Sequence, residues 1–297
     1  MIPRHLRSAL LFIAGSVLAT GLFAQAPAAP KIDFPAPSPQ GVIKQRVGLT
    51  DIEVTYNRPS MKGRKVFGGL VPYGQVWRTG ANNATRITFS TAAKLNGAAV
   101  PAGTYELFTI PGETEWTVIV QAVKEKAQWG SYAYDQKNDT ARFTAKPEAF
   151  PYPVETFAIN IGELSDTSAT LALFWEKVRV PVRIEVDTVA TLVPQVEAVM
   201  ASDAEKKPFF AAAMFYYENN LDLAKAAAWM AKGLEAQPNA YWMHYRHGLI
   251  LAKKGDKAGA LAAAQHSLNL VKSDDKAPAA LKDEYTRLND ALLASLK

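Results

Sequence analysis

Cysteine is absent from all 297 residues of the sequence. A disulfide framework, a thiol nucleophile, a thiolate metal site and a lipid anchor on an N-terminal cysteine are therefore excluded. Histidine is nearly as scarce, with four residues, and none lies between His5 and His244. A histidine-based catalytic triad is thus impossible through most of the chain, where carboxylates remain as the groups for acid–base chemistry.

An excess of charge of one sign is also missing. The sequence has 33 basic and 28 acidic residues, and its formal net charge of +5 is too weak and too mixed to predict nucleic-acid binding. Neither a nucleophile elbow, nor a P-loop, nor a Gly-x-Gly-x-x-Gly turn occurs. The sequence therefore predicts no cofactor.

Long apolar runs are limited to one, "ALLFIAGSVLATGLF" at residues 9–23. Arg4 and Arg7 precede it and the small residues "AQA" follow, which is the pattern of an export signal. We predict a signal peptide at residues 1–26 and a periplasmic or secreted protein, with a retained N-terminal anchor as the alternative. No other stretch is long and apolar enough to cross a membrane, so no span is expected after signal removal.

The rest of the chain divides by its hydrophobic period. Residues 27–40 carry a proline every few positions and predict an extended linker. From 41 to 187 the period is two, as in "DIEVTYN", "TRITFS" and "SATLALFW", and Asn96-Gly97 is a strong hairpin signal. These short strands predict an all-β antiparallel domain, either a sandwich or a jelly-roll-like barrel.

At residues 188–297 the period changes to 3.6 and alanine becomes the commonest residue. The stretch that starts at Lys207 aligns with a second one at an offset of 34 residues, which pairs Asp222 with Asp256 and Leu234 with Leu268. This spacing resembles the tetratricopeptide (TPR) repeat and predicts an all-α TPR-like domain, with capping helices near 189–201 and 277–295.

Several long sequence segments of the β region resemble the family named domain of unknown function 2911 (DUF2911). They are "VPYGQVWRTGANNATRITF", "PAGTYELFTIPGETEWTVIV", "QWGSYAYD" and "LFWEKVRVPV". The resemblance covers about residues 40–186. It implies a compact β domain in an exported bacterial protein and transfers no chemistry.

Donor-rich loops at residues 58–83 form the candidate ligand site. The candidates are basic, aromatic or amide side chains beside turn-forming glycines: Arg58, Lys62, Arg64, Trp77, Arg78, Asn82 and Asn83. If the loops meet at one end of the sandwich, they suit a carboxylate, a phosphate or an acidic sugar. The alternative is that Trp77 and Arg78 cover the open end of the sandwich, with the arginine bonded to buried loop carbonyls.

Other candidates are less specific. We expect any protein partner of the helical repeats to bind a groove lined by Tyr217, Tyr241 and Tyr245. His244 and His247 are one helical turn apart, but they occupy packing positions and no acidic residue completes a zinc helix, so no metal site is predicted. Two further sets are carboxylates and aromatics of the β region that are open to either a surface role or a site role: Glu106, Glu113, Glu115, Asp135, Glu155, Trp116, Trp129, Tyr132 and Tyr134.

These patterns favour a non-catalytic exported protein whose β domain binds an anionic or carbohydrate ligand and whose helices hold a protein partner. No catalytic residue is assigned. Two alternatives remain open: a hydrolase of envelope carbohydrate that uses a carboxylate pair, and a scaffold without a small ligand.

Overall fold

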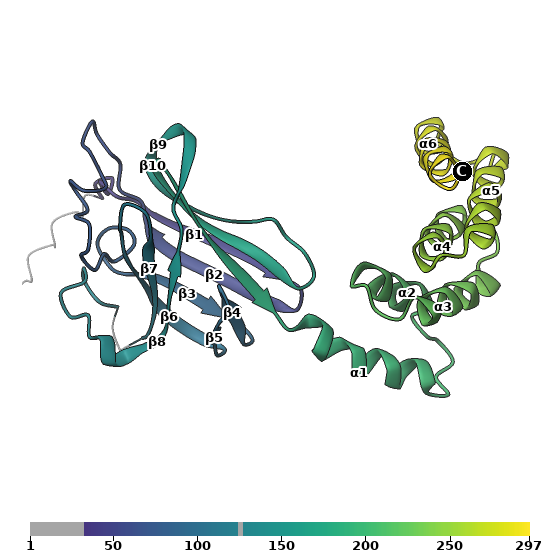
Figure 1. Cartoon of the computed structure of the whole chain (residues 1–297), viewed down its shortest axis with the longest axis horizontal. Helices are drawn as coiled ribbons and strands as arrows, with labels where there is room; N and C mark the ends of the chain where they lie inside the picture. Colours follow the sequence, from purple (N-terminus) through teal and green to yellow (C-terminus); the bar gives the residue numbers. More distant parts are fainter. Residues whose placement is uncertain (1–32, 124–126) are drawn as a thin grey trace, which may run out of the picture. The chain divides into compact units, whose positions relative to one another are not determined.

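The computed structural model describes residues 33–123 and 127–297 (Figure 1). The predicted signal peptide and the first part of the predicted linker lie outside these residues. Residues 33–39 precede the first strand and belong to no helix or strand. Within the described ranges, no helix combines the length and the apolar character needed to cross a bilayer.

Two antiparallel sheets form the N-terminal part, which confirms the predicted all-β domain. The larger sheet has the order β1-β2-β3-β6-β7-β8, and the smaller has the order β5-β4-β10-β9. The strands of the larger sheet are β1 (Gln40–Val47), β2 (Thr50–Asn57), β3 (Thr85–Phe89), β6 (Gly103–Ile110), β7 (Trp116–Ala122) and β8 (Asp139–Ala145). Those of the smaller sheet are β4 (Ala93–Leu95), β5 (Ala98–Val100), β9 (Glu148–Gly162) and β10 (Ser168–Val186).

The main core lies between the two sheets, because alternate side chains of each sheet point inward. Along β2, Ile52, Val54 and Tyr56 are buried, as their period of two predicts. The predicted hairpin joins β4 to β5, with both Asn96 (φ 47°) and Gly97 (φ 83°) in the left-handed region that its turn requires.

Strands β6 and β7 are buried on both faces, which their alternation alone does not predict. Phe108 and Ile119 point away from the main core and pack with Ala84 in a second apolar cluster. Val76 and Tyr134, which are partly buried, pack against this cluster from two loops. The outer face of the larger sheet is therefore covered by the loop that precedes β3 and by the loop that follows β7.

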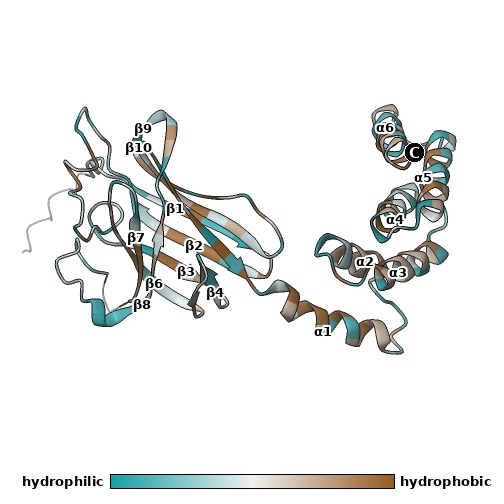
Figure 2. Ribbon diagram, in the orientation of Figure 1, coloured by the Kyte–Doolittle hydropathy of each residue, from teal (hydrophilic) through white to brown (hydrophobic). Residues whose placement is uncertain are grey.

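Six helices follow, which confirms a helical region after the β domain. They are α1 (Thr188–Ala201), α2 (Phe209–Glu218), α3 (Leu223–Ala236), α4 (Tyr241–Lys254), α5 (Lys257–Ser273) and α6 (Ala279–Ser295). Asp222 and Asp256, which the 34-residue offset pairs, cap the N-termini of α3 and α5. The helices expected at the two ends correspond to α1 and α6, while the TPR assignment itself stays a prediction. Figure 2 shows apolar stretches along both sheets and along α1.

Candidate functional site

Trp77 belongs to the main core. Its side chain is 8% exposed, stacks on Trp175 at a centroid distance of 5.8 Å and meets Trp116 and Phe157 edge-on. The indole Nε1 donates to the carbonyl of Gly80 at 3.0 Å. The indole therefore offers no exposed face to a ligand, in agreement with the structural role considered for it.

Two of the candidate arginines donate side-chain hydrogen bonds to main-chain carbonyl oxygens. The Nε of Arg58 donates to the carbonyl of Phe157 in β9 at 3.1 Å. Arg64 donates to the carbonyls of Ser60 and Met61 at 2.7 and 2.8 Å. These guanidinium groups hold the 58–69 loop together and against β9.

Two carboxylates anchor the same loop through its main chain. Glu155 accepts from the N–H of Lys62 at 2.8 Å, and the ammonium of Lys62 is left exposed. Glu176 accepts from the N–H groups of Val66 and Phe67 at 2.6 and 3.3 Å. The first three sequence candidates thus lie in a loop whose contacts are structural.

Arg78, Asn82 and Asn83 have different neighbours. The N–H of Gly130 donates to the carbonyl of Asn82 at 2.9 Å, and the main chain of Asn83 forms an isolated antiparallel β-bridge with that of Trp129. These contacts join the 76–84 segment to residues 127–134. Apart from Trp77, which is in the main core, the candidates therefore divide into two groups, one in the loop held against β9 and one against the 127–134 loop.

Arg78 lies on the opposite side of the chain from Trp77, because successive side chains of an extended segment alternate. Its Nε is buried and has no hydrogen-bond partner among the residues that the structure describes. A Cβ added at Gly130 would be 3.1 Å from Nη1 of Arg78 and 2.6 Å from Cε2 of Tyr132. The guanidinium and the tyrosine ring therefore lie against the same glycine.

Two exposed aromatic side chains complete this surface. Tyr132 is 85% exposed and Trp129 is 64% exposed. Gly130, with φ at +71°, stands between them in the chain. We call Arg78, Trp129, Gly130 and Tyr132 the outer-face site. Large aromatics normally bury most of their surface, so their exposure here next to an incompletely bonded guanidinium marks the site as a candidate for recognition.

A strained residue fixes the corner between Trp77 and the site. Thr79 is fully buried and has φ at +52°, a conformation that is costly for a β-branched residue. Its hydroxyl lies 3.1 Å from that of Thr109, and its carbonyl accepts from the hydroxyl of Thr85 at 2.5 Å. These buried contacts hold the backbone in the turn that sends Trp77 inward and Arg78 outward.

Beneath the 127–134 loop lies a row of polar side chains across adjacent strands. The register aligns Arg86 with Glu106 and Glu106 with Gln121. Glu106 is fully buried, and its carboxylate accepts from the main-chain N–H and the side-chain amide of Gln128 at 2.7 and 2.6 Å. Gln128 also donates to Gln121 at 2.8 Å. The role of Glu106 was open from the sequence, because neither the strand register nor the covering loop that buries it is predictable from its own strand.

The row continues to β8 and ends at an ion pair. Gln121 donates to the carboxylate of Asp139 at 3.4 Å, and the hydroxyl of Tyr134 donates to the same carboxylate at 2.9 Å. Burial, and then the bond to Asp139, raise the pKa of Tyr134, so its hydroxyl stays a donor. Arg142 completes the network at 3.2 Å from Asp139. At the other end of the row, Nε of Arg86 is buried, and within residues 33–123 and 127–297 nothing accepts from it.

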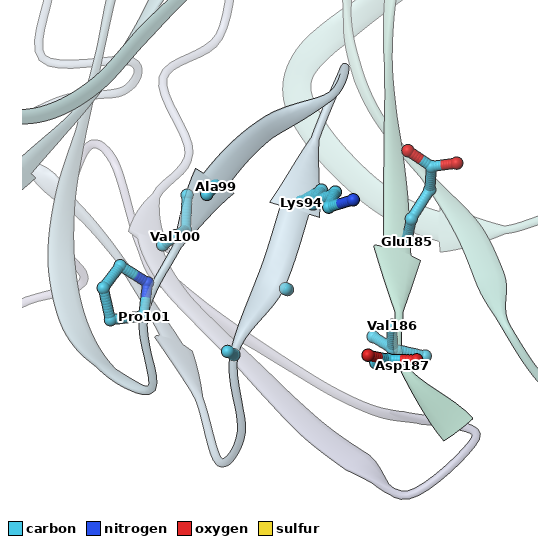
Figure 3. Close-up of a pocket in the computed structure, with 9 residues that line it drawn as sticks. Lys94, Ala99, Val100, Pro101, Glu185, Val186 and Asp187 are labelled. Atoms are coloured by element: carbon cyan, nitrogen blue, oxygen red, sulfur yellow. The ribbon is translucent and has the colours of Figure 1, made fainter. Parts of the chain in front are cut away.

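A hollow of about 440 Å³ lies near the end of the smaller sheet (Figure 3). Figure 3 shows Lys94 on β4 facing the neighbouring strand β10, which carries Glu185, and Asp187 follows at the end of that strand. Glu185 lies 3.4 Å from Nε of Arg183, an ordinary surface ion pair. The carboxylates singled out from the sequence do not line this hollow.

The predicted tyrosine groove of the helical region is partly covered. The ring of Tyr285 in α6 meets Tyr241 and Tyr245 edge-on, at centroid distances of 4.9 and 6.0 Å. Lys253 places its ammonium 4.6 Å from the ring centre of Tyr217. Burial raises the pKa of Tyr217 and Tyr241. Helix α6 thus lies against two of the three tyrosines at which a partner was expected to bind.

No curated protein and no solved structure matches the chain. A family model described as "Protein of unknown function (DUF2911)" matches residues 38–184, a span that holds the outer-face site and nearly all of both sheets. The β domain is therefore similar to the DUF2911 family, as the segments quoted from its sequence predicted.

Proposed function

We propose that this is an exported, non-catalytic protein whose β domain binds an acidic carbohydrate at the outer-face site. One observation carries the proposal: the exposed ring of Tyr132 lies against the same glycine as the Arg78 guanidinium, whose Nε has no partner in the described part of the chain, and the exposed Trp129 directly precedes that glycine. We also propose that the helical domain holds a protein partner.

The chemistry of the site favours a sugar that carries a carboxylate. The faces of Trp129 and Tyr132 offer the flat apolar surface on which the C–H groups of a sugar ring can stack. The planar guanidinium of Arg78 matches a carboxylate through two parallel hydrogen bonds. Both rings are open to solvent, which suits a chain of sugars better than a metabolite that must be enclosed on most sides.

The buried carboxylate under the loop has a supporting role in this proposal. Both oxygens of Glu106 accept hydrogen bonds from Gln128, and no part of Glu106 is exposed. Because Gln128 directly precedes Trp129, these bonds hold the aromatic residues in place. A buried carboxylate whose oxygens are occupied is poorly placed to protonate a glycosidic oxygen.

Calorimetric titration with a uronic-acid oligosaccharide and with its neutral counterpart tests the proposal. Trp129→Ala and Tyr132→Ala should each weaken binding of both sugars by about tenfold, since one aromatic contact contributes roughly 0.5–1.5 kcal/mol beyond its buried area. Arg78→Lys keeps the charge but loses the paired donors, so it should weaken binding of the acidic sugar alone.

Tyr152→Ala and Arg64→Ala are the matched controls. Tyr152 is a 72% exposed aromatic on β9, and Arg64 is bonded within its own loop. Both variants should bind like the wild type. Equal weakening by the controls, or unchanged binding after loss of Trp129 and Tyr132, would contradict the proposal.

A further inference from the structure

The helical domain brings three histidines to one hollow of about 550 Å³ between α3, α4 and α5. His244 and His247 come from α4, His266 comes from α5, and Glu235 contributes from α3. Apolar residues such as Leu234 and Ala263 make up most of the wall. The sequence places only His244 and His247 together, so the approach of His266 is a consequence of packing.

Two of the imidazole rings are close enough to share an ion. The ring centroids of His244 and His266 are 4.4 Å apart, with an interplanar angle of 79°. With metal–nitrogen bonds of about 2.0–2.1 Å, the ring centres of two imidazoles on one ion are roughly 4.5 Å apart when the two bonds meet at a right angle, and roughly 5 Å apart at the tetrahedral angle. The observed spacing is close to the right-angle value, which square-planar and octahedral ions provide.

The hydrogen bond of His244 also prepares the ring as a ligand. Its Nε2 lies 2.8 Å from the carbonyl of Pro238, and a carbonyl only accepts, so Nε2 carries the proton. In the neutral ring the lone pair is then on Nδ1. A ligating histidine typically donates its other N–H to a carbonyl or carboxylate in this way.

We propose that His244 and His266 form a two-imidazole site for a divalent transition-metal ion, of the class of Cu²⁺, Ni²⁺ and Zn²⁺. Imidazole suits these ions, and hard ions such as Mg²⁺ prefer oxygen. No set of three His, Asp or Glu groups in the described part of the chain is arranged around one ion, so water completes the coordination. A bound ion joins α4 to α5 and stabilises the helical domain by mass action.

The test titrates the EDTA-treated full chain with Cu²⁺, Ni²⁺, Zn²⁺ and Mg²⁺ by calorimetry, and records the electron paramagnetic resonance spectrum of the Cu²⁺ form. We expect binding of the first three ions and not of Mg²⁺, with two coupled nitrogens in the spectrum. His244→Ala and His266→Ala should each weaken binding by about tenfold or more, because even the loss of an outer hydrogen-bond partner costs about 10–100-fold.

His247→Ala is the matched control, since it removes an imidazole from the same hollow and leaves the pair intact. It should retain wild-type affinity, and thermal unfolding of all three metal-free variants checks that each is folded. Binding that persists in the His244→Ala/His266→Ala double variant would overturn the proposal. An equal loss in all three single variants would overturn the two-ligand geometry.

Discussion

Neighbouring residues of the outer-face site have opposite roles because the backbone alternates. Trp77 fills the core between the sheets, whereas Arg78, one residue later, lies against Gly130 on the other side. The strained Thr79 then turns the chain. A tryptophan and an arginine that read as one motif in the sequence therefore belong to different environments.

Gly130 is the residue on which the geometry of the site depends most directly. Gly130→Ala places a methyl group 2.6 Å from the ring of Tyr132 and 3.1 Å from the guanidinium of Arg78, so both must move. It also forces an L side chain into φ +71°, which costs about 1–2 kcal/mol. We expect loss of sugar binding together with a lower free energy of unfolding, measured by titration and by urea denaturation.

Gly63→Ala is the control that separates these two effects. Gly63 has nearly the same φ, +74°, but no atom lies within 4 Å of an added Cβ. It should show a comparable loss of stability and normal sugar binding. If Gly130→Ala binds sugar like Gly63→Ala, the contacts around Gly130 do not shape the site.

Among the elements, β10 anchors the 58–69 loop through an irregularity. Its pairing with β9 shifts register on both sides of Glu176, and Glu176 itself has φ at +53°. The shift lets its carboxylate reach the N–H groups of Val66 and Phe67. This explains why the basic loop, which appeared suited to a ligand, is instead tied to the sandwich.

Glu176→Ala should lower the free energy of unfolding by about 2–3 kcal/mol, because it removes hydrogen bonds to a charged acceptor and leaves two N–H groups unsatisfied. Urea denaturation measures the loss, and limited proteolysis should show faster cleavage within 58–69. Glu185→Ala, on the same strand, removes only a surface ion pair and should change stability little. Similar losses in both variants would argue against the anchoring role.

At the scale of the whole molecule, the two structural regions have separate cores. The buried residues of the main sandwich core run from Val47 to Val186, and those of the largest helical core run from Ala213 to Ala263. The two sets have no member in common. Each region therefore buries its own apolar surface, which is the usual condition for independent folding.

We predict that residues 38–187 fold alone and keep the sugar affinity of the full chain. Chemical cross-linking in envelope extract should join the full chain to a protein partner in a defined adduct. A chain that lacks residues 188–297 should give no such adduct. Circular dichroism and titration check the first part, and mass spectrometry of the adduct checks the second. An unfolded fragment would contradict the separation of the cores, and an adduct on the fragment would place the partner surface on the β domain.

Much of the architecture was predictable from local sequence patterns. The period of two along β2, the Asn96-Gly97 turn and the change of period near Thr188 each depend on neighbours in sequence, and each was predictable. The N-caps at Asp222 and Asp256 follow from the same local chemistry. The candidate ligand site was only partly predictable, because the glycine and the tyrosine that lie beside Arg78, Gly130 and Tyr132, are about fifty residues further along the chain.

The sequence by itself determined the order of a β region and a helical region, the absence of any thiol chemistry and the turns that shape the hairpins. Only tertiary structure decided that Trp77 is buried, that Glu106 lies beneath Gln128 and that His266 meets His244. The physical reason is that secondary structure follows from steric and hydrogen-bonding preferences of adjacent residues. Strand register, loop coverage and helix packing are instead set by contacts between segments far apart in the chain.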